Sequence, residues 1–207
     1  MYTIFAEGKQ NDVPVLVGSN ANEGANLRLP PPTLENAADQ AELSKLYPGT
    51  QISNVMADMM QWTMHTWARL ETKTGTHKAY RYYFSHAPPF PLDQKFDRDV
   101  SHMGAFHSAE IIYVFNNLDI RKARNWPWTP YDYKLADTMS SYWVNFAAKG
   151  DPNGPGLPEW PAFTEASPQV MQFGEKVQVI PEPRPEELKF WDRMNHSEQL
   201  TVPAPSR

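Results

Sequence analysis

Three absences limit what this chain of 207 residues can be. It has no cysteine, which excludes disulfide bonds and thiolate metal sites within it and leaves the redox compartment open. It has no apolar run near the ~20 residues of a transmembrane helix. It also has no long basic run, and its net charge is −5, which disfavours attraction to nucleic acid or to an anionic membrane. We therefore expect no membrane span and no nucleic-acid partner.

Apolar periodicity predicts the helices. Apolar side chains recur at three- and four-residue intervals over about 56–70 and, most clearly, over 131–149. Gly150 is placed to end the second of these helices. Shorter helices are expected over 35–47 and 186–194.

Three stretches predict strands. Val13–Val17 is a short run rich in β-branched residues, typical of a strand buried on both faces, and Lys78–Ser85 contains four aromatic residues. Residues 170–173 and 177–180 flank a glycine-containing turn and predict a terminal hairpin. The alternation of strands and helices predicts an α/β fold with a mostly parallel sheet flanked by helices.

Two short motifs offer acid–base chemistry. The first is a polar turn, here called the acid turn, which presents the Glu23 carboxylate: Ser19-Asn20-Ala21-Asn22-Glu23-Gly24. The second is a loop, here called the histidine loop, which presents the His107 imidazole: Gly104-Ala105-Phe106-His107-Ser108-Ala109-Glu110. An acid followed by a base, each placed just after a strand, is the chain order of the last two members of an α/β-hydrolase triad. The first member would be a serine inside Gly-x-Ser-x-Gly, and none of the ten glycines belongs to such a pentapeptide.

These residues resemble the type-B carboxylesterase family, the α/β-hydrolases that include cholinesterases and bacterial para-nitrobenzyl esterases. Three blocks carry the resemblance: Val13–Gly24, Gly104–Phe115, and the long block from Ala136 to Pro161, which contains Ser140-Ser141-Tyr142-Trp143-Val144-Asn145-Phe146-Ala147 and Gly150-Asp151-Pro152-Asn153. They follow the family's order but match only its C-terminal portion. We therefore expect residues 1–207 to be the C-terminal segment of a single α/β-hydrolase domain.

The resemblance implies a carboxylic-ester hydrolase with a Ser-His-Glu mechanism, acting on small-molecule esters without a cofactor or a metal. It makes Glu23 the catalytic acid and His107 the base. The nucleophilic serine and the oxyanion loop would lie in an N-terminal half of the same fold, so the isolated chain should be inactive. The family often pairs through helices near the C-terminus, so a homo-oligomer is conceivable. The resemblance favours an extracellular or periplasmic location and leaves a cytoplasmic one open.

Neighbouring polar residues have expected supporting roles. Ser19 and Asn20 should shape the acid turn through hydrogen bonds from side chain to backbone. Glu110 has two readings that remain open: it holds the histidine loop by hydrogen bonds, or it is a buried anchor paired with an arginine. A zinc site of His102, His107 and Glu110 is conceivable, but its spacing fits no known zinc signature.

Other features have plainer interpretations. The remaining histidines are expected to be surface or hydrogen-bonded residues: His65, His77, His86 and His196. Trp62, Trp67 and the aromatic residues of 80–84 could line a substrate pocket, although core packing is the commoner role.

Two other functions compete with hydrolysis. One is a cholinesterase-like adhesion or binding module that has lost catalysis, which the retention of both Glu23 and His107 disfavours. The other is an inactive fragment, which would expose strand edges and apolar surface and therefore associate.

Overall fold

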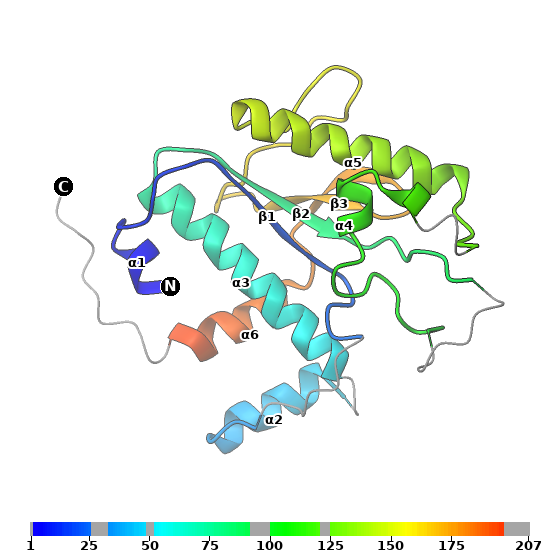
Figure 1. Ribbon diagram of the computed structural model, residues 1–207. Coiled ribbons are helices and arrows are strands. Elements are labelled where there is room, and N and C mark those ends of the chain that lie inside the picture. The colour runs from blue at the N-terminus through cyan, green and yellow to red at the C-terminus, as the bar shows by residue number, and fades with distance from the viewer. Residues whose placement is uncertain (1, 26–32, 49–51, 92–99, 121–124, 197–207) are drawn as a thin grey trace.

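Four strands form one sheet at the centre of the molecule (Figure 1). The computed structural model describes residues 2–25, 33–48, 52–91, 100–120 and 125–196. The strands lie in the order of the chain: β1 (Val15–Asn20), β2 (Ala79–Phe84), β3 (Gln169–Phe173) and β4 (Val177–Pro181). β1, β2 and β3 are parallel, and β4 returns antiparallel to β3. The mostly parallel sheet and its terminal hairpin are therefore confirmed.

The first strand differs in position from the sequence prediction of 13–17. Its ladder begins at Val15, whose amide donates to Lys78 O at 3.2 Å, because Pro14 has no amide hydrogen to donate. It continues to Asn20, which pairs with Phe84 of β2. The sheet thus carries the chain directly to the acid turn.

The four predicted helices are present, together with two short ones that were not predicted. The predicted set comprises α2 (Ala37–Leu46), α3 (Ile52–Thr74), α5 (Pro130–Lys149) and α6 (Pro185–His196). The additional helices are α1 (Tyr2–Ala6) and α4 (Ile111–Val114). None of the helices in the described ranges is long and apolar enough to cross a membrane.

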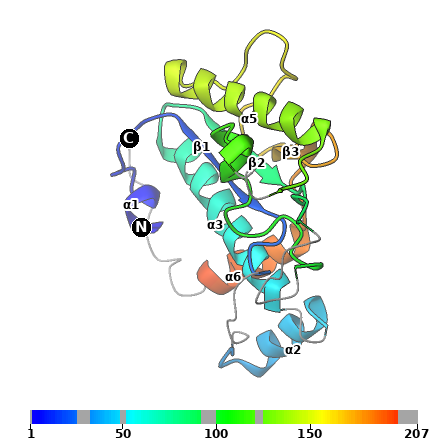
Figure 2. The same ribbon diagram turned by 45° about the vertical axis from the view of Figure 1, so that its right-hand side comes forward.

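Helices cover both faces of the sheet (Figures 1 and 2). On one face, Tyr80 and Phe84 of β2 pack against Met139 and Tyr142 of α5 in the largest buried cluster. On the other face, apolar side chains of β1 and β2 pack against Ala68 of α3. Successive side chains of a strand point to opposite faces of the sheet, so β2 contributes side chains to the buried clusters on both faces.

Both ends of α5 are capped as its sequence requires. Thr129 and Asp132 form a reciprocal capping box, with Pro130 in the first turn. At the other end, Gly150 adopts a left-handed φ of 71°, which glycine accepts without steric cost. The predicted C-terminal stop at Gly150 is therefore confirmed.

Candidate active site

Glu23 is held in a tight turn three residues beyond β1. Its Oε1 atom accepts a hydrogen bond from the backbone amide of Asn20 at 2.8 Å, so the turn closes on the carboxylate itself. The Glu23 side chain is only 8% exposed. A carboxylate fixed and shielded in this way keeps one oxygen, Oε2, for a partner outside the turn.

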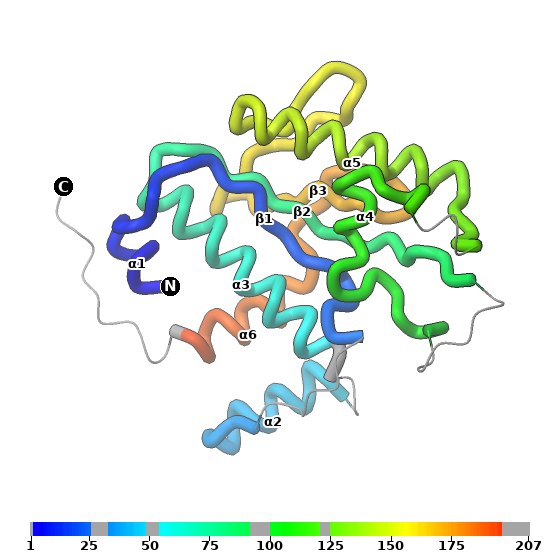
Figure 3. The backbone as a smooth tube through the Cα atoms, viewed as in Figure 1, coloured from blue at the N-terminus to red at the C-terminus, as the bar shows by residue number. Residues whose placement is uncertain are grey.

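That partner comes from a loop that runs beside the acid turn (Figure 3). Asn22 and Phe106 form an isolated parallel bridge, in which the Asn22 amide donates to Ala105 O at 3.0 Å. The Asn22 side chain makes a second hydrogen bond to the same residue, since its Oδ1 accepts from the Ala105 amide at 2.9 Å. We expected the base to follow a strand, and for His107 this is wrong. The described part of the loop makes only this single bridge and forms no strand before His107.

Gly104 lets the chain turn just before it pairs with Asn22. Its φ of +53° lies in the left-handed region, and a Cβ atom at this position would be 2.2 Å from Asn22 Oδ1. The chain therefore turns sharply at Gly104 and passes directly against Asn22. The turn brings the next residues over the acid.

His107 and Glu23 are in direct contact. His107 Nδ1 lies 2.6 Å from Glu23 Oε2, a distance typical of a strong charge-assisted hydrogen bond. The His107 side chain is 49% exposed, and Nε2 makes no hydrogen bond within the described residues. The carboxylate fixes the imidazole through Nδ1–H, so Nε2 is left to accept a proton from another group.

Asn20 ties the histidine loop to β1. Its Nδ2 donates to Phe106 O at 2.8 Å and also to Glu110 Oε2. Burial raises the pKa of Glu110, and the hydrogen bond from Asn20 opposes that rise. Of the two open readings, the contacts match a carboxylate that holds the histidine loop. Glu110 pairs with no arginine in the described part of the chain.

Ser19 and Asn20 differ from the expectation for the acid turn. The Asn20 side chain reaches across to the histidine loop, and its backbone amide is what binds Glu23. Ser19 is 1% exposed, and its hydroxyl has no hydrogen-bond partner within the described ranges. The expected side-chain bond from Ser19 to the turn backbone is therefore wrong, because the residue lies inside β1, paired with Tyr83.

The remaining histidines lie outside this contact. His86 Nε2 is 2.8 Å from Asp132 Oδ1, and His77 Nδ1 is 3.0 Å from Asp12 Oδ1. His65 Nδ1 is 3.4 Å from Glu182 Oε2. Across the residues that the structure describes, no three His, Asp or Glu side chains are grouped as a metal would need, so the zinc reading gains no support. The side chain of His196 lies outside the described part.

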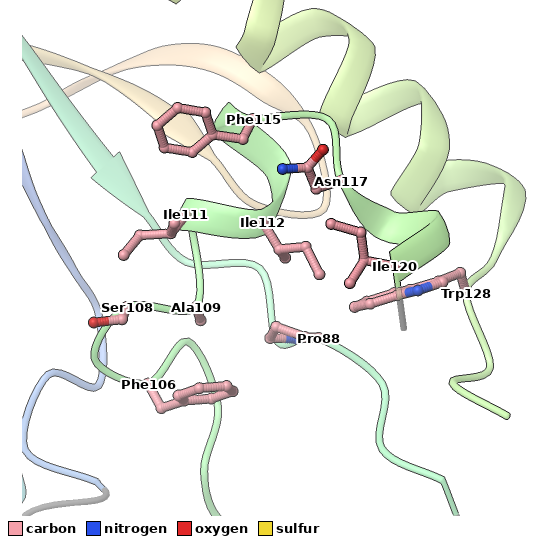
Figure 4. A pocket seen from close by; sticks show the side chains of 10 residues that line it. All are labelled: Pro88, Phe106, Ser108, Ala109, Ile111, Ile112, Phe115, Asn117, Ile120 and Trp128. Atoms are coloured by element: carbon pink, nitrogen blue, oxygen red, sulfur yellow. The ribbon is translucent and has the colours of Figure 1, made fainter. Parts of the chain in front are cut away.

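An apolar pocket of about 320 Å³ adjoins the histidine loop (Figure 4). Phe106 and Ser108, the residues on either side of His107, line it, and Ile111 and Ile112 of α4 form the opposite wall. This volume lies within the ~300–1,000 Å³ of small-molecule sites. Of the aromatic residues expected to line a pocket, Tyr80 and Phe84 are packed in the core, whereas Trp62 and Trp67 line a different pocket, between α1 and α3.

Sequence reasoning missed Asn22, which makes the two backbone-linking hydrogen bonds between acid turn and histidine loop. An asparagine in a polar turn is common, and its partner lies 83 residues away. The only signal in the sequence is Gly104. A glycine permits another segment to pass close to the backbone, but the sequence does not reveal that this segment is the turn containing Asn22.

Comparison with known proteins gives the same family as the motifs. The carboxylesterase family model matches residues 33–191. Carboxylesterase 1E of Mus musculus is 26% identical over 231 residues, covering 95% of this chain and 39% of that protein. Carboxylesterase 5A of Felis catus is 37% identical over 116 residues, covering 54% of this chain and 20% of that protein.

A thermophilic PNB esterase has a similar fold, with a TM-score of 0.68 at 22% identity over 91% of this chain and 40% of its own. The fold is thus the C-terminal part of an α/β-hydrolase, and the chain spans about two fifths of the length of such relatives. Because the family model covers well over half of the chain, this protein belongs to the carboxylesterase family.

Proposed function

We propose that this chain supplies the acid and the base of a carboxylic-ester hydrolase with a Ser-His-Glu mechanism. The observation that carries the proposal is the 2.6 Å contact between His107 Nδ1 and Glu23 Oε2, in a histidine whose side chain is 49% exposed. His107 would take the serine proton through Nε2 and return it to the leaving alcohol. Glu23 would fix the tautomer and stabilise the imidazolium without taking the proton.

The nucleophile must come from elsewhere. No Gly-x-Ser-x-Gly is present in the 207 residues, and no serine hydroxyl contacts His107 in the described ranges. We assign the serine and the oxyanion donors to an N-terminal part of the same domain, of which residues 1–207 form the C-terminal segment. The isolated chain is then inactive.

The neighbouring pocket suggests the kind of substrate. Its lining residues carry no charge, so it suits the apolar portion of a neutral, small-molecule ester. A non-catalytic binding module would need neither the acid nor the base, and the intact contact between them favours hydrolysis over that alternative.

Complementation tests the proposal. The chain alone should give no burst of p-nitrophenol from p-nitrophenyl acetate, because it has no activated serine. Mixed with an N-terminal half that carries Gly-x-Ser-x-Gly, it should give turnover that falls at least ~10³-fold on His107→Ala or Glu23→Gln. His102→Ala, an exposed histidine five residues earlier, serves as the matched control and should keep that turnover.

Two outcomes would contradict the proposal. A stoichiometric burst from the chain alone would reveal a nucleophile within it. Turnover of the mixture that survives His107→Ala would show that this imidazole is not the base.

A further inference from the structure

The segments that lead into β1 and β2 meet beside the C-terminal end of α3 (Figures 1 and 2). Asp12, in the segment between α1 and β1, accepts from the Thr76 amide at 2.9 Å and from Thr76 Oγ1 at 2.6 Å. Asp12 Oδ1 also lies 3.0 Å from His77 Nδ1. These contacts are here called the Asp12 clasp. The six residues of β1 separate the clasp from the acid turn.

Glu71 is enclosed at this junction without a partner. It lies in the last turn of α3 and is 0% exposed, and neither of its carboxylate oxygens has a hydrogen-bond partner within the described residues. Gln10 Oε1 is likewise buried and unpartnered there. A buried carboxylate that accepts no hydrogen bond is costly when it is ionised. A proton on Glu71 removes that charge and supplies a donor to this group of acceptors.

Asp12 and Glu71 approach the same point beside Gly75. A Cβ atom built on Gly75 would lie 2.7 Å from Glu71 Oε1 and 2.9 Å from Asp12 Oδ1. Asp12 is the anion of the two, because hydrogen bonds from Thr76 and His77 hold the pKa of its carboxyl group well below the usual range. A second carboxylate at such close range is disfavoured by repulsion, and the free carbonyls at the end of α3 add to the negative potential.

We propose that Glu71 is a proton-controlled latch, which is neutral while the Asp12 clasp is closed and which releases the segment before β1 when it ionises. Burial and the charge of Asp12 raise the pKa of Glu71, whereas His77 and Gln10 oppose that rise. The titratable groups that face Glu71 within the described residues are Asp12, before β1, and His77, before β2. His77 acts in the same direction, since its imidazole offsets the negative charge only when it is protonated.

The latch does not depend on the ester hydrolysis proposed above, and it can be tested on the 207-residue chain itself. In the unfolded chain Glu71 loses its proton near pH 4.5, whereas the folded chain holds the proton to a higher pH. The cost of ionisation is therefore absent below about pH 4.5 and complete above the folded pKa. Glu71→Gln cannot ionise, so it should raise the midpoint of urea unfolding at pH 8 and change it little at pH 4. Glu165→Gln, at an exposed glutamate, is the control and should change neither midpoint.

NMR titrations report the latch and the clasp separately. The ¹³C signal of the Glu71 carboxyl group, identified by its loss in Glu71→Gln, should titrate above pH 4.5. The Thr76 amide donates to Asp12, so its ¹⁵N signal should follow the opening of the clasp. In His77→Asn, which lacks the neighbouring imidazole, this signal should still shift above pH 4.5, and adding Glu71→Gln should abolish the shift. A Glu71 signal that titrates at or below pH 4.5, no shift of Thr76 in His77→Asn, a shift that survives Glu71→Gln, or no gain in stability for Glu71→Gln at pH 8 would overturn the proposal.

Discussion

Gly104 controls how closely the histidine loop approaches the acid turn. The residue combines a left-handed φ of +53° with a backbone that lies directly against the Asn22 side chain. Asn22 in turn makes the bonds to Ala105 that align the loop. A side chain at position 104 would therefore strain its own backbone and also push Asn22 away from Ala105.

Gly104→Ala is predicted to destabilise the chain by more than its backbone strain alone. The left-handed conformation costs a non-glycine residue about 1–2 kcal/mol, and forcing Asn22 aside should add at least about 1 kcal/mol. Gly156→Ala is the control, since Gly156 has a φ of +79° but nothing within 4 Å of an added Cβ. Urea unfolding of both variants measures the difference. Equal losses would show that the contact with Asn22 contributes nothing.

Some of the residues at the site could be predicted from the sequence, and others could not. Glu23 and His107 were found because each lies in a short motif with a recognisable chain order. Asn22 and the role of Gly104 were not, because their significance depends on a contact between segments more than 80 residues apart. The orientation of Asn20 toward Phe106 has the same long-range cause.

α4 and α5 are joined through one buried carboxylate. Asp132 Oδ1 accepts from Tyr113 of α4 at 2.7 Å and lies 2.8 Å from His86 Nε2, while Oδ2 accepts from the Thr129 amide at 2.8 Å. Burial alone would raise the pKa of Asp132, but the hydrogen bonds from His86, Thr129 and Tyr113 lower it to about 2. The start of α5 thus fixes the short helix that directly follows the histidine loop.

Asp132→Asn should lower the free energy of unfolding at neutral pH by about 1–3 kcal/mol, because hydrogen bonds to a charged acceptor become weaker or are lost. The folded pKa lies below the usual value of 3.8, so the carboxylate stabilises the fold above about pH 3.8 and loses this contribution as the pH falls toward 2. The difference between the parent chain and Asp132→Asn should shrink over that window.

Asp137→Asn is the control for this prediction. Asp137 lies on the same helix, is exposed, and accepts from Asn116 Nδ2 at 2.8 Å. Its replacement should change stability by less than about 0.5 kcal/mol. Urea unfolding at pH 7 and pH 3 gives both comparisons, and a pH-independent loss for Asp132→Asn would contradict the assigned role.

At the level of elements, apolar periodicity located the long helices, and the glycine-containing turn located the hairpin. The period of α5 and its capping residues agree with one another, so both its ends could be predicted closely. The four-residue α4 and the five-residue α1 have too few turns to show a period. The first strand begins two residues later than predicted, because Pro14 has no amide hydrogen with which to pair, and it ends three residues later.

Apolar side chains next to the histidine loop are exposed on the surface of the molecule. Ile111, Phe115 and Ile120, here called the α4 patch, are 47%, 68% and 70% exposed and all line the pocket of Figure 4. Among the described strands, β1 pairs with β2 alone, so β1 is an edge strand of the sheet. Exposed apolar side chains that line one pocket favour association with another apolar surface.

The α4 patch is therefore predicted to drive self-association of the isolated chain. Sedimentation velocity over a range of concentrations should show oligomers, and Phe115→Ser with Ile120→Ser should weaken their formation at least tenfold, because each buried apolar side chain contributes ~1.5–3 kcal/mol. Val144→Ser provides the control, since Val144 is 67% exposed on α5 but does not line the pocket. It should change the association constant less than twofold. If Val144→Ser weakens association as much as the double variant, general surface apolarity is the cause, and if the parent chain stays monomeric at all concentrations, the patch is too small to act alone.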